Sequence, residues 1–325
     1  MTNYMVTGAA GFIGAALVEH MLNLGHQVFG VDNLSDTYDV RMKKHRLSQL
    51  QSREDFHFLF ADISDQDIVE QLEAFCPQPK ALINLAAMAG VRSSLADPHA
   101  YLKTNTLGAL NMLEYARQRQ IPKFVQASSS TVYGDQGHSP YVEDSGTDHP
   151  LQPYAASKKS AEAYCYAYHH LYNLDVSVLR FFNVYGPAGR PDMAIFRFCQ
   201  WIAEGRPVRV NGNGEQTRGL TYIEDINHGV MLALQPFGFE VFNLGGHEVI
   251  TINQLIRLLE NALEKKADVI YGPANPADMP ENQADVGKAR RMLGWEPRVN
   301  LVEGVEHLVA WYLREREWVR DIKTG

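Results

Sequence analysis

A glycine-rich turn between an apolar strand and a helix is the feature that most constrains the fold of this chain. The turn, Gly8-Ala9-Ala10-Gly11-Phe12-Ile13-Gly14, follows the predicted strand Tyr4–Thr7 and opens the predicted helix Gly11–Leu24. Glycines let the backbone turn tightly and approach a pyrophosphate, to which the helix N-terminus offers free N–H groups and a positive dipole end. The turn therefore predicts a phosphate-binding loop in an α/β fold.

The acidic residue after the next strand indicates which ligand the turn would hold. Asp32 follows the predicted strand Gln27–Val31, and its carboxylate can accept hydrogen bonds from both hydroxyls of an adenosine ribose. The same charge would repel a 2′-phosphate, and no arginine follows it directly. A tight turn followed by a helix-capping aspartate is the structural alternative. The strand–turn–helix–strand context favours a dinucleotide, and NAD over NADP.

Strands and helices alternate through the first half of the chain. Further strands are expected at Phe56–Phe60, Ala81–Leu85, Lys123–Ala127 and Val176–Arg180. The helices expected between them include Asp65–Phe75, Pro98–Gln118 and Tyr154–Tyr172. Such alternation, with several strands that are continuous apolar runs, predicts a parallel sheet covered by helices on both faces. The predicted fold class is α/β, a doubly wound parallel sheet.

The regular alternation is lost after about residue 182. Residues 183–219 are rich in Gly, Pro and Arg, and the later elements include an expected helix at Ile252–Leu263 and a last amphipathic helix from Leu301. We expect a nucleotide-binding domain at residues 1–182 and a smaller α/β substrate-binding lobe at residues 183–325. The two are expected to be interleaved, because lobes of this kind often return strands to the main sheet.

Composition argues against several other classes of protein. A net charge of −8 is unlike a nucleic-acid surface, and no apolar run approaches the length of a membrane span. The N-terminus has no basic leader before its apolar run, so the expected location is the cytoplasm. Cys76, Cys165 and Cys199 give neither a disulfide framework nor a metal motif, and they are expected to be free thiols in segments that otherwise read as helix.

A tyrosine and a lysine, Tyr154 and Lys158, share one face of a predicted helix because they lie four residues apart. The serine-rich stretch Ser128-Ser129-Ser130-Thr131 ends the predicted strand upstream. A free tyrosine has a pKa of about 10, and a nearby ammonium group and an oxidised nicotinamide ring would both favour its phenolate. With a serine hydroxyl to hold the substrate oxygen, this trio can take a proton from an alcohol while hydride leaves its carbon. In isolation the spacing usually means an exposed aromatic and a solvated lysine; its place in a dinucleotide-binding domain favours catalysis.

The glycine spacing resembles that of short-chain dehydrogenases/reductases, and further stretches extend the likeness over nearly the whole chain. Asp62-Ile63 resembles the adenine-contacting pair, Leu85-Ala86-Ala87 the stretch under the cofactor, and Asn105 the asparagine of the next helix. Matched to the family's motifs, Ser129 is the catalytic hydroxyl, Tyr154 the acid/base, and Lys158 the residue that lowers the tyrosine pKa and contacts the nicotinamide ribose. The implied cofactor-binding residues are Gly8, Gly11, Phe12, Ile13, Gly14, Asp32, Asn33, Asp62, Ile63, Leu85, Ala86, Ala87, Asn105, Tyr154 and Lys158.

Within this family the extended members that act on nucleotide sugars are the most similar. The tail Leu293-Gly294-Trp295-Glu296-Pro297 resembles nucleotide-sugar epimerases and dehydratases, and the segments 31–40, 89–92 with 97–101, 154–159 and 186–194 resemble UDP-glucuronate 4-epimerases. The resemblance implies C4 epimerisation of UDP-glucuronate to UDP-galacturonate through transient oxidation to the 4-keto sugar, rotation and hydride return. It also implies a homodimer through the helices 98–118 and 154–172.

The resemblance further implies how a UDP-sugar is held. Arg190 is similar to the arginine that grips the hexuronic carboxylate, and its charge is expected to have a partner only when the substrate is a uronate. The alternative is a loop arginine in a surface ion pair. Arg218 is similar to the arginine on the UDP diphosphate, and Arg92 is a further candidate. The expected substrate-binding residues are Arg92, Ser129, Ser130, Thr131, Asn183, Arg190 and Arg218.

Several positions decide between relatives. Ser130-Thr131 stand where the 4,6-dehydratases carry Asp-Glu and the decarboxylases a Glu, which disfavours both reactions. Asn183, where glucuronate epimerases usually carry Thr, resembles UDP-glucose 4-epimerases. Gly219 replaces the usual Asp and is expected to loosen its loop, and Asn275 replaces an arginine toward the uridine. A UDP-glucose or UDP-N-acetylglucosamine 4-epimerase is the alternative, and a UDP-glucuronate decarboxylase or a non-catalytic NAD-binding protein fits less well.

Overall fold

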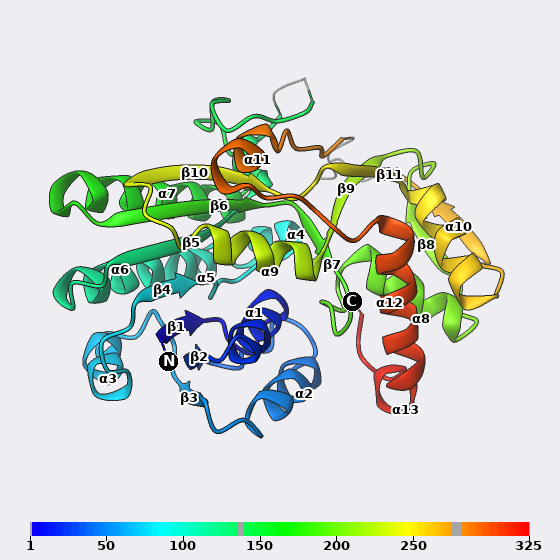
Figure 1. Ribbon diagram of the computed structural model, residues 1–325. Helices are drawn as coiled ribbons and strands as arrows, with labels where there is room; N and C mark the ends of the chain where they lie inside the picture. The colour runs from blue at the N-terminus through cyan, green and yellow to red at the C-terminus, as the bar shows by residue number, and fades with distance from the viewer. Residues whose placement is uncertain (1, 136–138, 275–280, 325) are drawn as a thin grey trace.

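One parallel sheet of seven strands organises the computed structural model, which describes residues 2–135, 139–274 and 281–324 (Figure 1). The strand order is β10-β6-β5-β4-β1-β2-β3, and every neighbouring pair is parallel. The strands are β1 (Asn3–Thr7), β2 (Gln27–Asp32), β3 (Phe56–Phe60), β4 (Ala81–Asn84), β5 (Lys123–Ser129), β6 (Asp175–Phe181) and β10 (Phe239–Leu244). The predicted fold class is confirmed, and the six strands expected in the first half lie within two residues of their predicted bounds.

Helices cover both faces of this sheet (Figure 1). On the interior strand β1, Tyr4 and Val6 belong to one hydrophobic cluster and Met5 to another, as the two-residue period of a strand requires. The first cluster also takes residues from α1 (Phe12–Asn23), α2 (Arg41–Leu50) and α9 (Ile223–Leu232). The second takes them from α3 (Ile68–Phe75), α6 (Gly108–Gln118) and α7 (Pro153–Tyr172).

The helix expected at Pro98–Gln118 is not a regular α-helix throughout. It begins as α5 (Pro98–Tyr101), widens into the π-helical turn η1 (Leu102–Leu107) and continues as α6. The turn leaves Asn105 buried. Single π-helical turns inside α-helices often lie at functional sites, and the hydrophobic period does not reveal them. A short helix, α4 (Val91–Ala96), precedes this segment.

The second half of the chain contributes to the main sheet and also forms smaller units. Strand β10 pairs with β6 in the main sheet, whereas the other strands form a three-stranded sheet, β11-β9-β7, and a pair, β12-β8. These strands are β7 (Asn183–Tyr185), β8 (Val208–Asn211), β9 (Thr217–Tyr222), β11 (Glu248–Thr251) and β12 (Val269–Gly272). The helices are α8 (Ala194–Ala203), α10 (Ile252–Leu263), α11 (Gly287–Leu293), α12 (Leu301–Arg314) and α13 (Arg316–Val319). The expected helix Ile252–Leu263 is confirmed, while the division at residue 182 stays a prediction.

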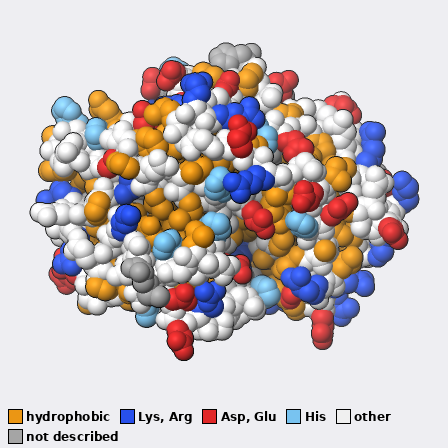
Figure 2. All heavy atoms as spheres, viewed as in Figure 1, with side chains coloured by type: hydrophobic (Ala, Val, Ile, Leu, Met, Phe, Trp, Pro, Cys, Tyr) orange, Lys and Arg blue, Asp and Glu red, His pale blue; other side chains and the backbone are white. Residues whose placement is uncertain are grey.

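The surface charge, the lengths of the helices and the state of the cysteines can be compared with the predictions. Acidic and basic side chains are interspersed over the face seen in Figure 2. Within the described ranges, no helix has the length and apolar character needed to cross a membrane. All three cysteines are buried free thiols, but Cys76 lies just past the end of α3 and not within a helix.

Candidate active site

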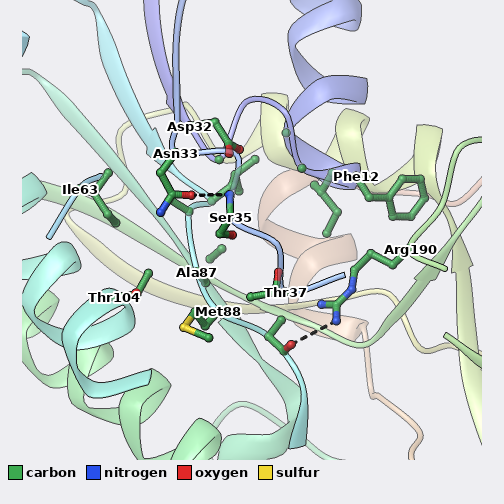
Figure 3. Close-up of a pocket in the computed structure, with 18 of the residues that line it drawn as sticks. Phe12, Asp32, Asn33, Ser35, Thr37, Ile63, Ala87, Met88, Thr104 and Arg190 are labelled. Carbon is green, nitrogen blue, oxygen red and sulfur yellow. Dashed lines mark hydrogen bonds between the residues drawn. The ribbon is translucent and has the colours of Figure 1, made fainter. Parts of the chain in front are cut away.

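A cavity of about 490 Å3 opens at the carboxyl ends of the parallel strands, the edge at which ligands bind in open α/β sheets. Figure 3 shows part of its lining, including the stretch from Asp32 to Thr37 and the side chain of Arg190. The predicted cofactor residues that line it are Gly8, Gly11, Phe12, Ile13, Gly14, Asp32, Asn33, Asp62, Ile63, Leu85, Ala86, Ala87, Tyr154 and Lys158. Two predicted substrate residues, Ser129 and Arg190, line the same cavity.

The glycine turn is packed so closely that side chains are excluded. Gly8 has a φ of +70°, and a Cβ on Gly14 would lie 2.0 Å from the Gly8 carbonyl oxygen. The Gly11 N–H donates to that same oxygen at 2.9 Å. Helix α1 carries no acidic residue in its first turn, so its N-terminus keeps its positive end. The turn can therefore hold an anionic group such as a pyrophosphate.

Two backbone N–H groups hold the Asp32 carboxylate, and the ammonium group of a lysine that was not predicted lies beside it. Its carboxylate accepts hydrogen bonds from the N–H groups of Ala10 and Leu34, at 3.1 and 2.8 Å. The Nζ of Lys43, on α2, lies 3.3 Å from the same carboxylate, and both side chains are buried. The repulsion that Asp32 would exert on a 2′-phosphate is thus partly offset by Lys43.

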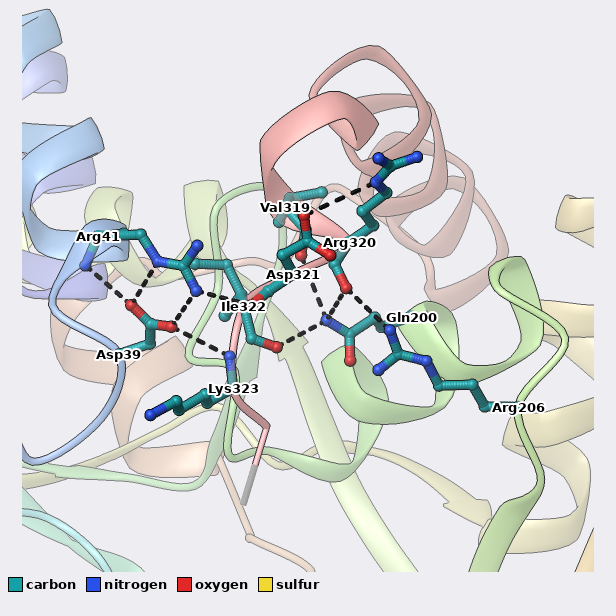
Figure 4. Close-up of polar contacts among 9 residues, drawn as sticks. All are labelled: Asp39, Arg41, Gln200, Arg206, Val319, Arg320, Asp321, Ile322 and Lys323. Carbon is teal, nitrogen blue, oxygen red and sulfur yellow. Dashed lines mark hydrogen bonds and ion pairs between the residues drawn. The ribbon is translucent and has the colours of Figure 1, made fainter.

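The loop that follows Asp32 is braced by the C-terminal tail (Figure 4). Arg41 pairs with Asp39 and donates to the carbonyl of Asp321 at 2.6 Å, while the Lys323 N–H donates to Asp39 at 3.1 Å. These bonds, the Arg41 pair first, lower the pKa of Asp39 to about 2. On α8, the buried Gln200 donates to three carbonyls of the tail, those of Val319, Arg320 and Ile322. Helix α8 and the C-terminal tail, which are distant from this loop in sequence, thereby support the wall of the cavity that the loop forms.

Strand β5 and helix α7 bring the predicted catalytic residues together. Ser129 ends β5, and its hydroxyl accepts a hydrogen bond from Thr131 Oγ1 at 3.0 Å and lies close enough to Tyr154 to lower the pKa of that phenol. Lys158 lies one turn beyond Tyr154 and donates from Nζ to the Ala127 carbonyl at 2.9 Å. The three side chains therefore meet at one edge of the cavity, as the sequence predicted.

Burial alters the protonation of both titratable members of this group. Burial raises the pKa of Tyr154, against the hydrogen bond from Ser129, which lowers it. Burial also lowers the pKa of Lys158 to about 8, although the charge of Glu162 acts in the opposite direction. The chain by itself therefore keeps Tyr154 protonated at neutral pH, and deprotonation requires a further positive charge in the cavity.

A buried ion pair lies next to the predicted catalytic residues and was not itself predicted. Glu162, one turn beyond Lys158, accepts hydrogen bonds from Arg180 Nε and Nη2 at 2.9 and 2.8 Å and from Ser128 Oγ at 2.5 Å. Both charged side chains are only 5% exposed. Arg180 also lies over the ring of Tyr133, 4.8 Å from its centre. The four-residue spacing from Lys158 to Glu162 was the available signal, since it continues the face that carries Tyr154.

The structure corrects the expectation for Arg190. Its Nε and Nη2 already bind Asp192 at 3.0 and 2.5 Å, and Nη2 also donates to the Ala89 carbonyl at 3.2 Å. The prediction that this charge lacks a partner without a uronate is wrong, because the acid two residues later in the same loop folds back onto it. The Asp192 pair raises the pKa of Arg190 against the opposing effect of burial. Arg190 nevertheless lines the cavity, and a substrate carboxylate would have to share it with Asp192 or displace Asp192.

Gly219 is tightly held, contrary to the expectation that it loosens its loop. Its N–H donates to the Asn282 carbonyl at 2.8 Å, and its carbonyl accepts from Asn183 Nδ2 at 3.2 Å. A Cβ at this position would lie 2.4 Å from the Gly246 carbonyl oxygen, so strand β9 has no room for a side chain there. Asn282 also donates to Ser130 Oγ at 3.4 Å, which joins Asn183, Gly219 and Ser130 in one polar group.

Several residues that were predicted to bind cofactor or substrate do not line the cavity. Asn105 is buried and bonds both the N–H and the carbonyl of Met88, at 2.8 and 2.9 Å, and it is Met88 that lines the cavity. Among the described residues, Arg92 on α4 and Arg218 on β9 lie outside this lining. Ser130, Thr131 and Asn183 also lie outside it, within two residues of a lining residue in sequence. Asn275 falls outside the described residues.

The comparisons with known proteins point to the same family as the sequence motifs. Residues 5–308 match the family model described as GDP-mannose 4,6 dehydratase. A UDP-glucuronate 4-epimerase of Thermodesulfobacterium geofontis is 46% identical over 326 residues, which span 100% of both chains. A probable UDP-glucuronate 4-epimerase of Rhizobium meliloti is 35% identical over 329 residues, covering 95% of this chain and 96% of the relative.

Solved structures with the same fold include two kinds of epimerase. A UDP-glucuronic acid 4-epimerase of Bacillus cereus, in complex with UDP-glucuronic acid and NAD, has a TM-score of 0.90 and 33% identity, covering 97% of this chain and 100% of the other. A UDP-glucose 4-epimerase of Thermotoga maritima, with UDP-glucose, has a TM-score of 0.90 and 32% identity with the same coverage. The chain therefore belongs to the GDP-mannose 4,6-dehydratase family of extended short-chain dehydrogenases/reductases.

Proposed function

We propose that this chain is an NAD-dependent UDP-glucuronate 4-epimerase, which interconverts UDP-glucuronate and UDP-galacturonate. The observation that carries the proposal is one cavity that combines Ser129, Tyr154 and Lys158 with Arg190. The relatives named above as UDP-glucuronate 4-epimerases, one of them crystallised with NAD, support the same choice.

The described residues fit NAD. The positive end of α1 and the side-chain-free turn at Gly8 and Gly14 suit its pyrophosphate, and Asp32 suits the hydroxyls of its adenosine ribose. When bound, NAD supplies reversible hydride acceptance at C4 of the sugar, with a positive charge on the oxidised nicotinamide. That charge is of the kind Tyr154 needs, because burial alone holds its pKa high.

The chain's own residues move the proton and hold the sugar oxygen. Tyr154 takes the proton from the C4 hydroxyl as that carbon is oxidised, and it returns the proton after the keto-sugar has turned over. The Ser129 hydroxyl, which lies beside Tyr154, holds the same oxygen in line. Lys158 keeps a positive charge one turn from Tyr154, supported by Glu162. One base that serves both directions is sufficient for an epimerisation with no net redox change.

Control of the substrate carboxylate distinguishes C4 epimerisation of a uronate from its decarboxylation. The 4-keto intermediate of a uronate is a β-keto acid, which loses CO2 once its carboxylate turns perpendicular to the carbonyl plane. Tyr154 and Ser129 would stabilise the resulting enolate, so the chain must suppress decarboxylation at the carboxylate itself. Arg190 can hold this group near the ring plane, and Ser130 and Thr131 offer hydroxyls and no acid for elimination.

A UDP-glucose 4-epimerase is the second candidate, and Asn183 is the observation that favours it. Its amide is bound to the Gly219 carbonyl and lies in the same polar group as Ser130. We test the two candidates with a panel of UDP-glucuronate, UDP-galacturonate, UDP-glucose and UDP-N-acetylglucosamine, with product analysis. UDP-galacturonate from UDP-glucuronate at a far higher kcat/KM than any hexose reaction supports the proposal, and faster turnover of UDP-glucose refutes it.

Removal of the Arg190 guanidinium is expected to separate uronate from hexose substrates. Arg190→Ala leaves the Asp192 carboxylate beside the substrate carboxylate without compensation, and loss of a charged partner typically costs about 2 kcal/mol or more, roughly thirtyfold in kcat/KM. UDP-glucose turnover should change by less than about threefold. Steady-state kinetics on both substrates, with the exposed Arg209→Ala as control, measures this. Equal losses on both substrates would show that Arg190 does not read the carboxylate.

Asp32→Ala is expected to weaken NAD and to favour NADP. The change removes an acceptor for the ribose hydroxyls, worth about tenfold in the Kd of NAD, and leaves Lys43 with no carboxylate at 3.3 Å. Lys43 can then attract a 2′-phosphate. Titration calorimetry with both dinucleotides tests this, with the exposed Asp67→Ala as control. An unchanged NAD affinity would exclude the role given to Asp32.

The proposed enzyme is a homodimer that works in the cytoplasm, a reducing compartment that suits three free thiols. Apolar side chains that are 50% or more exposed recur on η1 and α7: Leu102, Tyr166, Leu171 and Tyr172. A second copy would cover them, because soluble monomers seldom expose such a patch. Sedimentation should give twice the mass of one chain, and Tyr166→Glu with Leu171→Glu should halve it; a monomeric wild type would contradict the dimer.

A further inference from the structure

A buried arginine outside the predicted site connects three segments around the cavity. Arg46 lies on α2, is 5% exposed and forms no ion pair within the described part of the chain. Its Nη1 donates to the Ala10 carbonyl at 3.3 Å and to the Tyr38 hydroxyl at 2.8 Å. Its Nε and Nη2 donate to the Ala188 carbonyl at 2.9 and 2.7 Å, and Nη2 also to the Gly189 carbonyl at 3.0 Å. Every nitrogen of the guanidinium is thus used.

The three segments that Arg46 joins carry different parts of the proposed site. Ala10 belongs to the glycine turn, and Tyr38 belongs to the loop that follows Asp32 and lines the cavity. Ala188 and Gly189 come directly before Arg190. A buried charge without a carboxylate is costly unless its hydrogen bonds are satisfied, so Arg46 favours the arrangement in which these carbonyls keep their positions.

The side chain of Arg190 also lies close to Tyr38, the residue to which Arg46 is bonded. Its guanidinium lies over the ring of Tyr38, 5.7 Å from the ring centre, and that of Arg46 lies 5.6 Å from the same centre. Arg46 therefore contacts the surroundings of Arg190 in two places. It binds the backbone that directly precedes Arg190, and it lies near the Tyr38 ring over which the Arg190 guanidinium is placed. Arg46 itself is absent from the lining of the cavity, so any effect on substrate must pass through these contacts.

We propose that Arg46 is a positioning residue for substrate specificity, which sets Arg190 relative to the glycine turn so that a C5 carboxylate is recognised. The inference rests on the proposed function, because it takes Arg190 as the reader of the carboxylate. A lysine cannot replace Arg46, since one ammonium group cannot reach carbonyls on two loops in the planar fork that the guanidinium provides. The selectivity for a uronate is thus built partly from a residue in the nucleotide-binding half.

The test measures binding to the NAD-saturated protein. Dissociation constants for UDP-glucuronate and UDP-glucose are determined for wild type, Arg46→Lys, Arg46→Met and, as a control on the exposed face of α2, Lys44→Met. Both Arg46 variants should reduce the preference for UDP-glucuronate by about tenfold, the effect of losing one well-placed charged hydrogen bond, and Lys44→Met should not. Equal weakening of both ligands would overturn the proposal.

A double-mutant cycle isolates the path through Arg190. Combined with Arg190→Ala, Arg46→Met should cause no further loss of preference, because the group that it positions is already gone. An equal loss in both backgrounds would overturn the proposal. If the Arg46 variants do not fold, Tyr38→Phe, which removes only the hydroxyl bonded to Arg46, takes their place in the same cycle, with a loss of preference expected and no loss overturning it. An Arg190→Ala variant that keeps the preference would overturn the proposal, because Arg190 would not be the reader, whereas a wild type without preference for UDP-glucuronate would refute the proposed function.

Discussion

Tyr154→Phe should lower kcat for UDP-glucuronate by about a thousandfold, within the range of a lost general acid–base catalyst, and leave bound NAD in place. The ring that remains still packs against Tyr101, whose centre lies 6.0 Å away, so the cavity keeps its shape. Only the hydroxyl that lies beside Ser129 and exchanges the proton is lost. Single-turnover and steady-state rates, together with the NAD content of the purified variant, measure the two effects separately.

The matched control for this change lies on the same helix. Tyr166 is 57% exposed and is not among the residues that line the cavity, so Tyr166→Phe should leave both kcat and NAD content unchanged. Near-normal turnover of Tyr154→Phe would remove this residue from the proton transfer. Loss of NAD together with turnover would mean that the phenol serves cofactor binding and that its chemical role is unproven by the variant.

Glu162→Gln should destabilise the folded protein by about 3–5 kcal/mol, the typical cost of removing one member of a buried ion pair. Arg180 would keep its charge with 5% exposure and no carboxylate to accept from its Nε and Nη2. The hydroxyl of Ser128, beside the catalytic Ser129, would lose its charged acceptor as well. Urea unfolding monitored by circular dichroism gives the free energy of unfolding.

A surface pair provides the comparison for Glu162. Glu296 pairs with Arg290 at 3.4 Å, with side chains 68% and 49% exposed, and exposed pairs contribute about 1 kcal/mol or less. Glu296→Gln should therefore change the free energy of unfolding by no more than that. If Glu162→Gln costs as little as Glu296→Gln, the cluster behind the catalytic residues does not have the electrostatic role assigned to it.

Much of the fold and of the catalytic group could be predicted because the signals are local. Apolar strands alternating with helices predict a parallel sheet, and the turn at Gly8 marks where its ligand edge begins. Tyr154 and Lys158 needed only the four-residue period of one helix. The serine-rich end of a strand predicted a hydroxyl near them, since the carboxyl ends of parallel strands meet at one edge, and the resemblance to the family's motif selected Ser129.

What could not be predicted depends on contacts between distant segments. The bonds from Arg46 to Ala188 span 142 residues, and the brace between Asp39 and Lys323 spans 284. No hydrophobic period predicts which carbonyl a guanidinium will reach. The error over Arg190 was different, because Asp192 was visible two residues away and only the folded loop shows that it turns back onto the guanidinium.

Deuterium at C4 of UDP-glucuronate provides the most direct test of the proposed reaction. The NAD-loaded protein is incubated in ordinary water with this labelled substrate, without added NAD, and the products are analysed by NMR and mass spectrometry. We expect UDP-galacturonate that retains the deuterium at C4, with only traces of UDP-pentose, because C4 gives up and regains its hydrogen within one closed site. Loss of the label to water, or UDP-pentose as the main product, would contradict the account.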